Sequence, residues 1–419
     1  MSNKRKPDVT RRGFIKGAAA GSALAGFSIP ASANPARKFK IGLIGCGGRG
    51  SGAAGNAMQA AKTQGDSASI YACADLFKDR AERARRTNNI PKERTFVGFD
   101  GFRKLLDLDL DYVILATPPH FRPEHFASAI AAGKNVFTEK PVAVDAPGIR
   151  RFLAAGEAAK KAGLSVAAGT QRRHQKQYIE CQKRVADGAI GQIVNGRCYW
   201  NMGGLWTRKK EDGWADVEWQ IRNWLYFTWL SGDHIVEQHI HSLDKALWLM
   251  DDQPPKVAFG LGGRQMRTEE KWGHVFDHFA VCYEWENGAK TFAFTRQMSG
   301  CSNNVEDYVQ GTKGSARILH NSVTGGDTTW RYRGAKPSMY DVEHKELFAA
   351  IRSGDTINNG TYMSYSTMLA ILGREVCYTG KSITWDQAMK SEMDLSPTQY
   401  EFGPVEVPAI AQPGKTPFA

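Results

Sequence analysis

The chain has 419 residues, 42% of them hydrophobic, and a formal net charge of +12. Its length predicts two domains, and no segment approaches the roughly 18 uncharged apolar residues of a membrane span. The basic residues are scattered and are not interleaved with aromatic residues, which argues against nucleic acid as a partner. We therefore expect a globular protein that binds neither a nucleic acid nor a membrane.

The N-terminal segment, residues 1–33, contains the parts of an export signal in order. Arg11-Arg12 is a twin-arginine pattern, residues 17–30 are rich in alanine and glycine, and Ala31-Ser32-Ala33 is an A-x-A cleavage site. We expect a twin-arginine signal peptide, which places the mature protein in the periplasm or elsewhere outside the cytoplasm.

Near the start of the mature chain, an apolar run at residues 41–44 predicts a strand. The motif Gly45-x-Gly47-x-x-Gly50 follows, and then a run of small residues, 51–61, that predicts a helix. In this order the first glycine makes a tight turn, the second lets a pyrophosphate approach the backbone, and the third lets helix and strand pack closely. The helix N-terminus offers N–H groups to phosphates.

A second strand, residues 69–75, ends at Asp75. A carboxylate at this point can accept hydrogen bonds from the adenosine ribose and repels a 2′-phosphate, so it favours NAD over NADP. Further strands at 112–116, 135–138 and 165–168 alternate with helices, which predicts an α/β domain with a doubly wound parallel sheet over residues 38–168. Ligands bind beyond the carboxyl ends of such strands.

The ends of the later strands carry two specific motifs. Thr117-Pro118-x-His120 follows one strand, and Glu139-Lys140-Pro141 follows the next. Together with the glycine turn they resemble the Gfo/Idh/MocA oxidoreductases, and the resemblance covers nearly all the mature chain. It implies a Rossmann dinucleotide-binding domain, then an α/β domain with a large, open, mostly antiparallel sheet at residues 169–400, and an extended tail at 401–419.

The resemblance also implies roles for residues. The lysine of the Glu-Lys-Pro motif, Lys140, is expected to contact the nicotinamide ribose and the reacting hydroxyl, and the large sheet is expected to form a homo-oligomer, a dimer or a tetramer. The expected cofactor contacts are Gly45, Cys46, Gly47, Arg49, Gly50, Asp75, Thr117, Pro118, His120, Glu139, Lys140 and Gln171.

The densest group of titratable residues in the second domain lies at residues 231–244. On one regular helix Glu237 and His241 form an i, i+4 pair, in which a carboxylate orients an imidazole as a general base. In the family, the histidine matching His241 is the acid–base catalyst, an aspartate stands where this chain has Glu237, and a glycine stands where it has His239. Lys140, Glu237 and His241 are therefore the expected catalytic residues.

A metal site is an alternative for the same segment, because His234, Glu237, His239 and His241 are suitable ligands for zinc or manganese. On a regular helix His239 points away from Glu237, so we expect no metal. Six tryptophans and one tyrosine between residues 200 and 229 suggest a carbohydrate cleft on which sugar rings stack. The expected substrate contacts are Arg173, Arg222, Trp224, Glu237, His239 and His241.

These features predict an exported NAD-dependent oxidoreductase that transfers hydride from a ring hydroxyl of a sugar or glycoside. Free nicotinamide cofactor is not expected outside the cytoplasm, so the cofactor should be loaded before export, held tightly and recycled. One alternative is an NAD-dependent glycosidase that transiently oxidises C3 and eliminates the aglycone, although the Tyr-Pro-x-His signature of those enzymes is absent. Another is a non-catalytic sugar-binding protein with a structural NAD.

Overall fold

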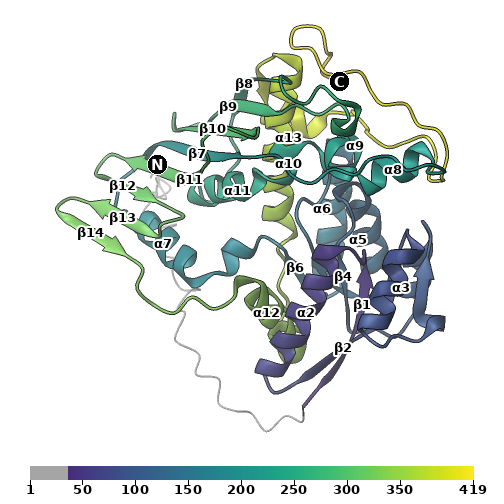
Figure 1. Ribbon diagram of the computed structural model, residues 1–419. Coiled ribbons are helices and arrows are strands. Elements are labelled where there is room, and N and C mark those ends of the chain that lie inside the picture. The colour runs from purple at the N-terminus through teal and green to yellow at the C-terminus, as the bar shows by residue number, and fades with distance from the viewer. Residues whose placement is uncertain (1–35) are drawn as a thin grey trace, which may run out of the picture. The chain divides into compact units, whose positions relative to one another are not determined.

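The computed structural model describes residues 36–419, and the predicted signal peptide, residues 1–33, lies outside them. Residues 38–419 form one unit that contains two β-sheets (Figure 1). The first sheet has six strands in the order β3-β2-β1-β4-β5-β6, and the second has nine in the order β14-β13-β12-β11-β7-β10-β9-β8-β15.

All strand pairs in the first sheet are parallel. Its strands are β1 (Lys38–Ile44), β2 (Ser67–Asp75), β3 (Thr95–Val97), β4 (Tyr112–Leu115), β5 (Asn135–Thr138) and β6 (Val166–Ala168). The helices between them are α2 (Gly48–Thr63), α3 (Lys78–Thr87), α4 (Gly101–Leu106), α5 (Arg122–Ala131) and α6 (Ala146–Lys161). The strand order reverses between β1 and β4, which is the switch point where such sheets bind ligands. The predicted Rossmann architecture is confirmed.

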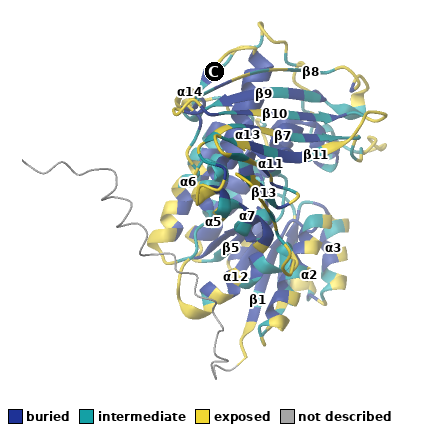
Figure 2. Cartoon of the chain, turned by 90° about the vertical axis from the view of Figure 1, so that its left-hand side faces the viewer, coloured by how far each residue is buried: buried dark blue, intermediate teal, exposed yellow. Residues whose placement is uncertain are grey.

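The second sheet is mostly antiparallel, with β7 and β10 as its one parallel pair within the described residues. Its strands are β7 (Ile193–Met202), β8 (Val257–Gly263), β9 (His278–Glu284), β10 (Lys290–Gln297), β11 (Asn304–Gly311), β12 (Gly314–Arg317), β13 (Ser322–Gly325), β14 (Thr328–Arg331) and β15 (Ile383–Thr384). Helices α11 (Ile240–Leu249) and α13 (Gly360–Thr379) pack on one face. Side chains alternate between buried and exposed along its central strands (Figure 2). The predicted large sheet is confirmed.

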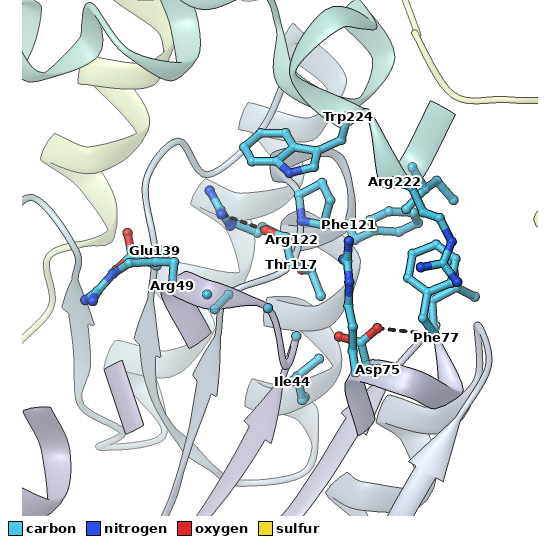
Figure 3. Close-up of a pocket in the computed structure, with 18 of the residues that line it drawn as sticks. Ile44, Arg49, Asp75, Phe77, Thr117, Phe121, Arg122, Glu139, Arg222 and Trp224 are labelled. Carbon is cyan, nitrogen blue, oxygen red and sulfur yellow. Dashed lines mark hydrogen bonds and ion pairs between the residues drawn. The ribbon is translucent and has the colours of Figure 1, made fainter. Parts of the chain in front are cut away.

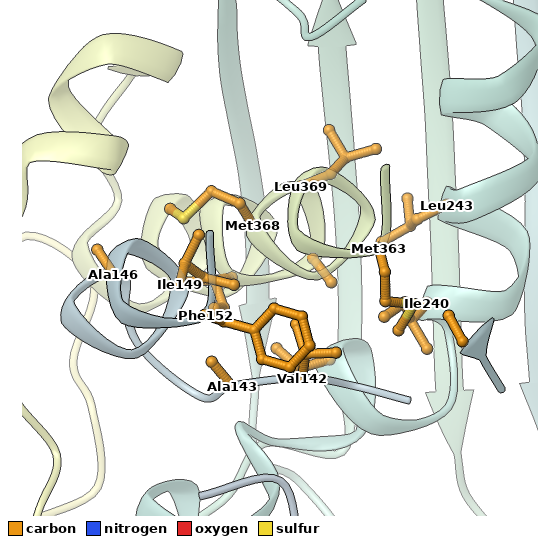
Figure 4. Close-up of a cluster of buried hydrophobic side chains, with 14 of the residues drawn as sticks. Val142, Ala143, Ala146, Ile149, Phe152, Ile240, Leu243, Met363, Met368 and Leu369 are labelled. Carbon is orange, nitrogen blue, oxygen red and sulfur yellow. The ribbon is translucent and has the colours of Figure 1, made fainter. Parts of the chain in front are cut away.

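The two sheets share a hydrophobic core. In α13, Met368 lies beside Ile149 of α6, and Leu369 and Phe152 belong to the same buried cluster (Figure 4). The helix α12 (Met339–Ser353) also returns to the first sheet and packs on α2. Its Phe348 ring lies 4.5 Å from that of Phe39 on β1. The nucleotide-binding half is therefore completed by a helix from near the C-terminus.

The remaining helices are α7 (Lys176–Ala186), α8 (Asp216–Arg222), α9 (Thr228–Ser231), α10 (His234–Glu237) and α14 (Trp385–Lys390). After α14 the chain forms no helix or strand up to its last described residue. None of the helices within residues 36–419 combines the length and apolarity needed to cross a bilayer.

Candidate active site

A cleft of about 1000 Å³ lies beyond the carboxyl ends of β1, β2, β4 and β5 (Figure 3). Residues from both sheet regions line it, so the first sheet forms its floor and the segment from α8 to α11 forms the opposite wall. We divide it into an adenosine end, beside Asp75, Phe77 and Phe99, and a reacting end, beside Lys140, Glu237 and His241.

The glycine turn meets three different steric demands. Gly45 has a positive φ of 94°, and a Cβ there would lie 2.7 Å from the Ala116 carbonyl carbon. A Cβ on Gly50 would lie 1.9 Å from the Gly45 oxygen. A Cβ on Gly47 would meet nothing within 4 Å, so the backbone there faces open space. Since Gly47 supplies no side-chain cap, the first N–H groups of α2 point at the space that a pyrophosphate needs.

The carboxylate of Asp75 ties the end of β2 to this turn. It accepts hydrogen bonds from the backbone N–H of Cys46 at 2.7 Å and of Phe77 at 2.9 Å. Burial raises the pKa of Asp75 above its usual value, against the lowering effect of these two bonds. Asp75 lines the cleft, whereas Cys46 and Gly50 lie beneath the lining and shape the turn.

Thr117 and Pro118 line the cleft, but His120 does not. The His120 imidazole hydrogen-bonds the Tyr400 hydroxyl at 2.8 Å, and burial lowers its pKa to about 4. The expected cofactor contact for His120 is therefore wrong. Arg122, which no sequence motif singled out, lines the cleft and donates to the Thr117 carbonyl at 2.6 Å.

An ion pair joins the two domains at the reacting end. The Lys140 ammonium donates to the Glu237 carboxylate at 2.6 Å and to the Glu237 carbonyl at 2.5 Å. The other Glu237 oxygen accepts from the Gln238 amide at 2.6 Å. The side chains of Lys140 and Glu237 are only 11% and 10% exposed, so their charges are poorly screened by water. The pair holds the ammonium in a fixed position in the cleft.

His241 has a different neighbour from the one expected. Its ring stacks on Trp200, with centroids 5.4 Å apart, and no hydrogen bond to its side chain occurs within residues 36–419. Burial lowers the pKa of His241 well below its usual value, and the positive charges of Lys140, Arg172 and Lys245 lower it further. The imidazole is therefore neutral at ordinary pH and can accept a proton.

The predicted Glu237–His241 pair is not formed, because the segment is not one regular helix. α10 ends at Glu237 and α11 begins at Ile240, with Gln238 and His239 between them. The break turns Glu237 toward Lys140 and leaves His241 on Trp200.

Two other histidines of this segment point into the core. His239 is fully buried with its Nε2 3.7 Å from the Cys198 sulfur, and burial lowers its pKa to about 3. His234 hydrogen-bonds the Asp233 carboxylate at 3.0 Å. The expected substrate contact for His239 is therefore wrong. The alternative metal site also fails, since no metal-binding group of side chains occurs in the described part of the chain.

Two arginines differ from expectation. Arg173 pairs with Asp244 at 2.9 Å and Asp252 at 2.6 Å and does not line the cleft, so it supports the fold and does not contact substrate. Arg222 lines the adenosine end, where its guanidinium lies 3.8 Å from the centre of the Phe77 ring. That position places Arg222 against the nucleotide half of the cleft rather than the substrate half.

Other selected residues do line the cleft: Trp224, Gln171, and Arg49 with Glu139. Arg49 pairs with Glu139 at 2.5 Å and with Glu343 of α12 at 3.5 Å. Tyr340, also of α12, lies under the Arg49 guanidinium at 4.9 Å and was not foreseen, because no local pattern links α12 to the glycine turn.

Comparison with known proteins decides the family. Residues 39–170 match an oxidoreductase family with an NAD-binding Rossmann fold, and residues 178–317 match the GFO/IDH/MocA C-terminal domain. The chain belongs to the Gfo/Idh/MocA oxidoreductase family. The resemblance read from the motifs is thereby confirmed.

Among the relatives of this Gfo/Idh/MocA protein is inositol 2-dehydrogenase of Klebsiella pneumoniae, which is 27% identical over 349 residues, 79% of this chain and 91% of the relative. The 2,7-anhydro-N-acetylneuraminate hydratase of Escherichia coli is 27% identical over 240 residues, 57% of this chain and 59% of that protein. The first relative is named for inositol and the second for 2,7-anhydro-N-acetylneuraminate.

Solved structures share the fold at low identity. Aldose-aldose oxidoreductase from Caulobacter crescentus, complexed with glycerol, superposes with a TM-score of 0.66 at 18% identity, covering 83% of this chain and 100% of that one. Levoglucosan dehydrogenase, in complex with NADH and levoglucosan, gives a TM-score of 0.66 at 18% identity, covering 83% and 99%.

Proposed function

We propose that this protein is an NAD-dependent oxidoreductase that acts on a ring hydroxyl of a sugar or glycoside. The observation that carries the proposal is the meeting of Lys140, Glu237 and His241 at one end of a cleft whose other end fits a dinucleotide. The open space at Gly47 and the uncapped start of α2 fit the pyrophosphate. The bound nicotinamide supplies the acceptor for a hydride from the carbon that bears the hydroxyl.

The chain's own residues handle the proton. The neutral imidazole of His241 takes the hydroxyl proton, while Lys140 donates a hydrogen bond to the oxygen on which negative charge develops. Glu237 holds Lys140 through two contacts, and Trp200 holds the His241 ring by stacking. Because burial and then three nearby cations disfavour the imidazolium, the pKa of His241 is low and the ring gives its proton up readily. That property supports a cycle in which the proton returns to a second carbonyl.

The preference for NAD over NADP rests on Asp75, whose carboxylate would repel a 2′-phosphate. Tight retention of the cofactor and export by the twin-arginine route belong to the same proposal, since an exported enzyme without free cofactor needs a resident one. Analysis of nucleotide released by heat from protein purified after export tests both. Recovery of NAD in stoichiometric amount is expected, and protein free of nucleotide would contradict retention.

A redox-neutral outcome is a second candidate. The Escherichia coli relative is named a hydratase, so membership of the family does not require net oxidation. Transient oxidation of a glycoside at C3 would acidify the C2 hydrogen and allow the aglycone to leave by elimination. Addition of water across C1 and C2 and return of the hydride to C3 would then make the net reaction hydrolysis.

One assay distinguishes the candidates. The protein is incubated with a panel of sugars and aryl glycosides, and reduced nicotinamide absorbance is followed together with release of the aglycone. Reduction without release identifies a dehydrogenase, and release without net reduction identifies the glycosidase. If neither occurs with any member of the panel, the enzymatic proposal loses its support and a sugar-binding role gains it.

We also propose that the open face of the second sheet binds a second copy of the chain. Phe259 and Leu261 on β8 and Phe292 on β10 are 44%, 68% and 36% exposed. Apolar side chains gathered on one face are typical of an interface. Light scattering should show an oligomer for the native protein and a smaller species for Leu261→Glu. Ile410→Glu, which changes a similarly apolar residue in the tail, should leave the mass unchanged.

A further inference from the structure

The C-terminal tail forms a loop that reaches the outer side of the aromatic residues that line the cleft. It leaves the end of α14 and returns there, since the Ser391 hydroxyl donates to the carbonyl of Ala419. The returning part is fixed at Thr379, whose carbonyl accepts from Gly414 at 2.8 Å. Residues 400–403 lie between these two anchored ends of the loop, and they make separate contacts.

These contacts are with aromatic residues at the adenosine end. The Phe402 ring stacks on Phe77 with centroids 6.1 Å apart and an interplanar angle of 7°, and it lies 5.8 Å from Phe99. Tyr400 lies 6.1 Å from Phe99 and 6.2 Å from Phe121, and its hydroxyl bonds to His120. Phe77, Phe99 and Phe121 all line the cleft. The tail thus packs on the outer side of the rings that a nucleotide would meet.

Helix α8 of the second domain also packs against the adenosine end of the cleft. Arg222 lies over the Phe77 ring and pairs with Asp79 of α3 at 3.2 Å (Figure 3). The loop and the helix are themselves joined, because the Val217 backbone N–H donates to the Gly403 carbonyl at 3.2 Å. Phe77 therefore contacts Arg222 of α8 as well as Phe402 of the tail, so its ring cannot swing outward unless one of these contacts opens.

We infer that residues 400–403 of the tail, from outside, and Arg222 of α8 support the aromatic wall of the adenosine site and so set the rate at which the dinucleotide is released. The inference rests on the proposed function, because it concerns the cofactor of that site. An adenosine between these walls leaves only when the aromatic contacts separate. Loss of one such stacking contact should accelerate release by up to about tenfold.

The test measures release of NADH from the full-length mature protein. NADH fluorescence is followed in stopped flow after mixing the complex with excess NAD. Phe402→Ala is expected to release NADH about tenfold faster than the native protein. Arg222→Met removes the ion pair from the opposite wall and should also accelerate release. Ile410→Ala lies in the same tail, is 45% exposed and should release at the native rate.

The variants should fold, because Phe402 is 48% exposed and contributes little to the core. Thermal unfolding and circular dichroism check this point. Release at the native rate from both Phe402→Ala and Arg222→Met would overturn the inference while leaving the proposed function intact. A native protein that binds no NADH would overturn the proposed function itself, and the two failures are therefore distinct.

Discussion

The two ends of the cleft are built from different interactions. The adenosine end is enclosed by side chains from three separate segments. They are the ring of Phe77, which directly precedes α3, the guanidinium of Arg222 in α8 and the ring of Phe402 in the tail. The reacting end depends on one ion pair, Lys140 with Glu237, and on one stacked imidazole. Packing between rings spreads a contact over a large surface and keeps it closed, whereas an ion pair fixes the positions of single atoms. From this difference we propose that the adenosine end governs how long the cofactor stays bound and that the reacting end governs how fast it is used.

Replacing Lys140 should have the largest effect on catalysis and should distinguish the roles of the two ends of the cleft. Lys140→Ala removes the donor to the developing oxyanion, so kcat should fall about 10³-fold. NADH affinity should change only a few-fold, since the adenosine end is untouched. Steady-state kinetics and fluorescence titration measure the two quantities. Lys256→Ala, at a side chain that is 58% exposed, serves as the control. A Lys140→Ala enzyme with native turnover would remove the lysine from the mechanism.

Replacing Glu237 should have the next largest effect. Glu237→Gln keeps the size of the side chain but removes the charge that holds Lys140, and kcat/KM should fall about 10²-fold. Glu286→Gln removes an exposed carboxylate of the second sheet region and should retain native kinetics. Equal rates for the native and Glu237→Gln enzymes would show that Lys140 needs no partner.

A pair of glycine substitutions tests the phosphate site between the two ends. Gly47→Ala introduces a Cβ into open space at an ordinary backbone conformation, so thermal stability should be unchanged. That Cβ occupies the approach of the pyrophosphate, and NADH should bind about tenfold more weakly or worse. Gly50→Ala should instead lower thermal stability, because its Cβ would lie 1.9 Å from the Gly45 oxygen. Full NADH affinity in a folded Gly47→Ala protein would place the pyrophosphate elsewhere.

The smallest expected effect concerns the charge around His241. Arg172 lies over the Trp200 ring at 5.3 Å and disfavours the imidazolium. Without this positive charge the pKa of His241 rises, so the base becomes protonated at a higher pH. In Arg172→Met the acid limb of the pH profile of kcat/KM should move up by about half a unit. Arg184→Met, on the exposed side of α7, should leave the limb in place. A limb that does not move would mean that another group titrates.

Sequence patterns predicted the parts of the fold that depend on local order. Strand, glycine turn and helix follow one another at Ile44 and Gly47, and polar motifs follow the ends of later strands. The residues that form the floor of the cleft could therefore be predicted from the sequence. Lys140 was selected through the resemblance carried by the Glu139-Lys140-Pro141 motif, which follows the end of a strand. The short strands β13 and β14 gave no such pattern and were not foreseen.

The errors concern side chains whose partners are distant in sequence. Arg173 was expected to contact substrate, but its guanidinium forms ion pairs with Asp244 and Asp252. Glu237 was expected on one helix with His241, but its ion pair with Lys140 forms across the domain boundary at a break between α10 and α11. Neither propensity nor spacing contains that information. His120 was misassigned for the same reason, since Tyr400 comes from the tail.

The contact between Phe39 and Phe348 has a consequence for how the protein is made. β1 is among the first elements to leave the ribosome, and α12 emerges only after nearly all of the second sheet. Until then the apolar surface around Phe39 and Tyr112 remains uncovered, because its partners Leu347 and Phe348 have not been synthesised. Contacts between such distant segments slow folding. The nucleotide-binding half therefore cannot complete its core until α12 has been synthesised, although it is encoded first, and residues 38–168 expressed alone would retain an apolar surface prone to aggregation.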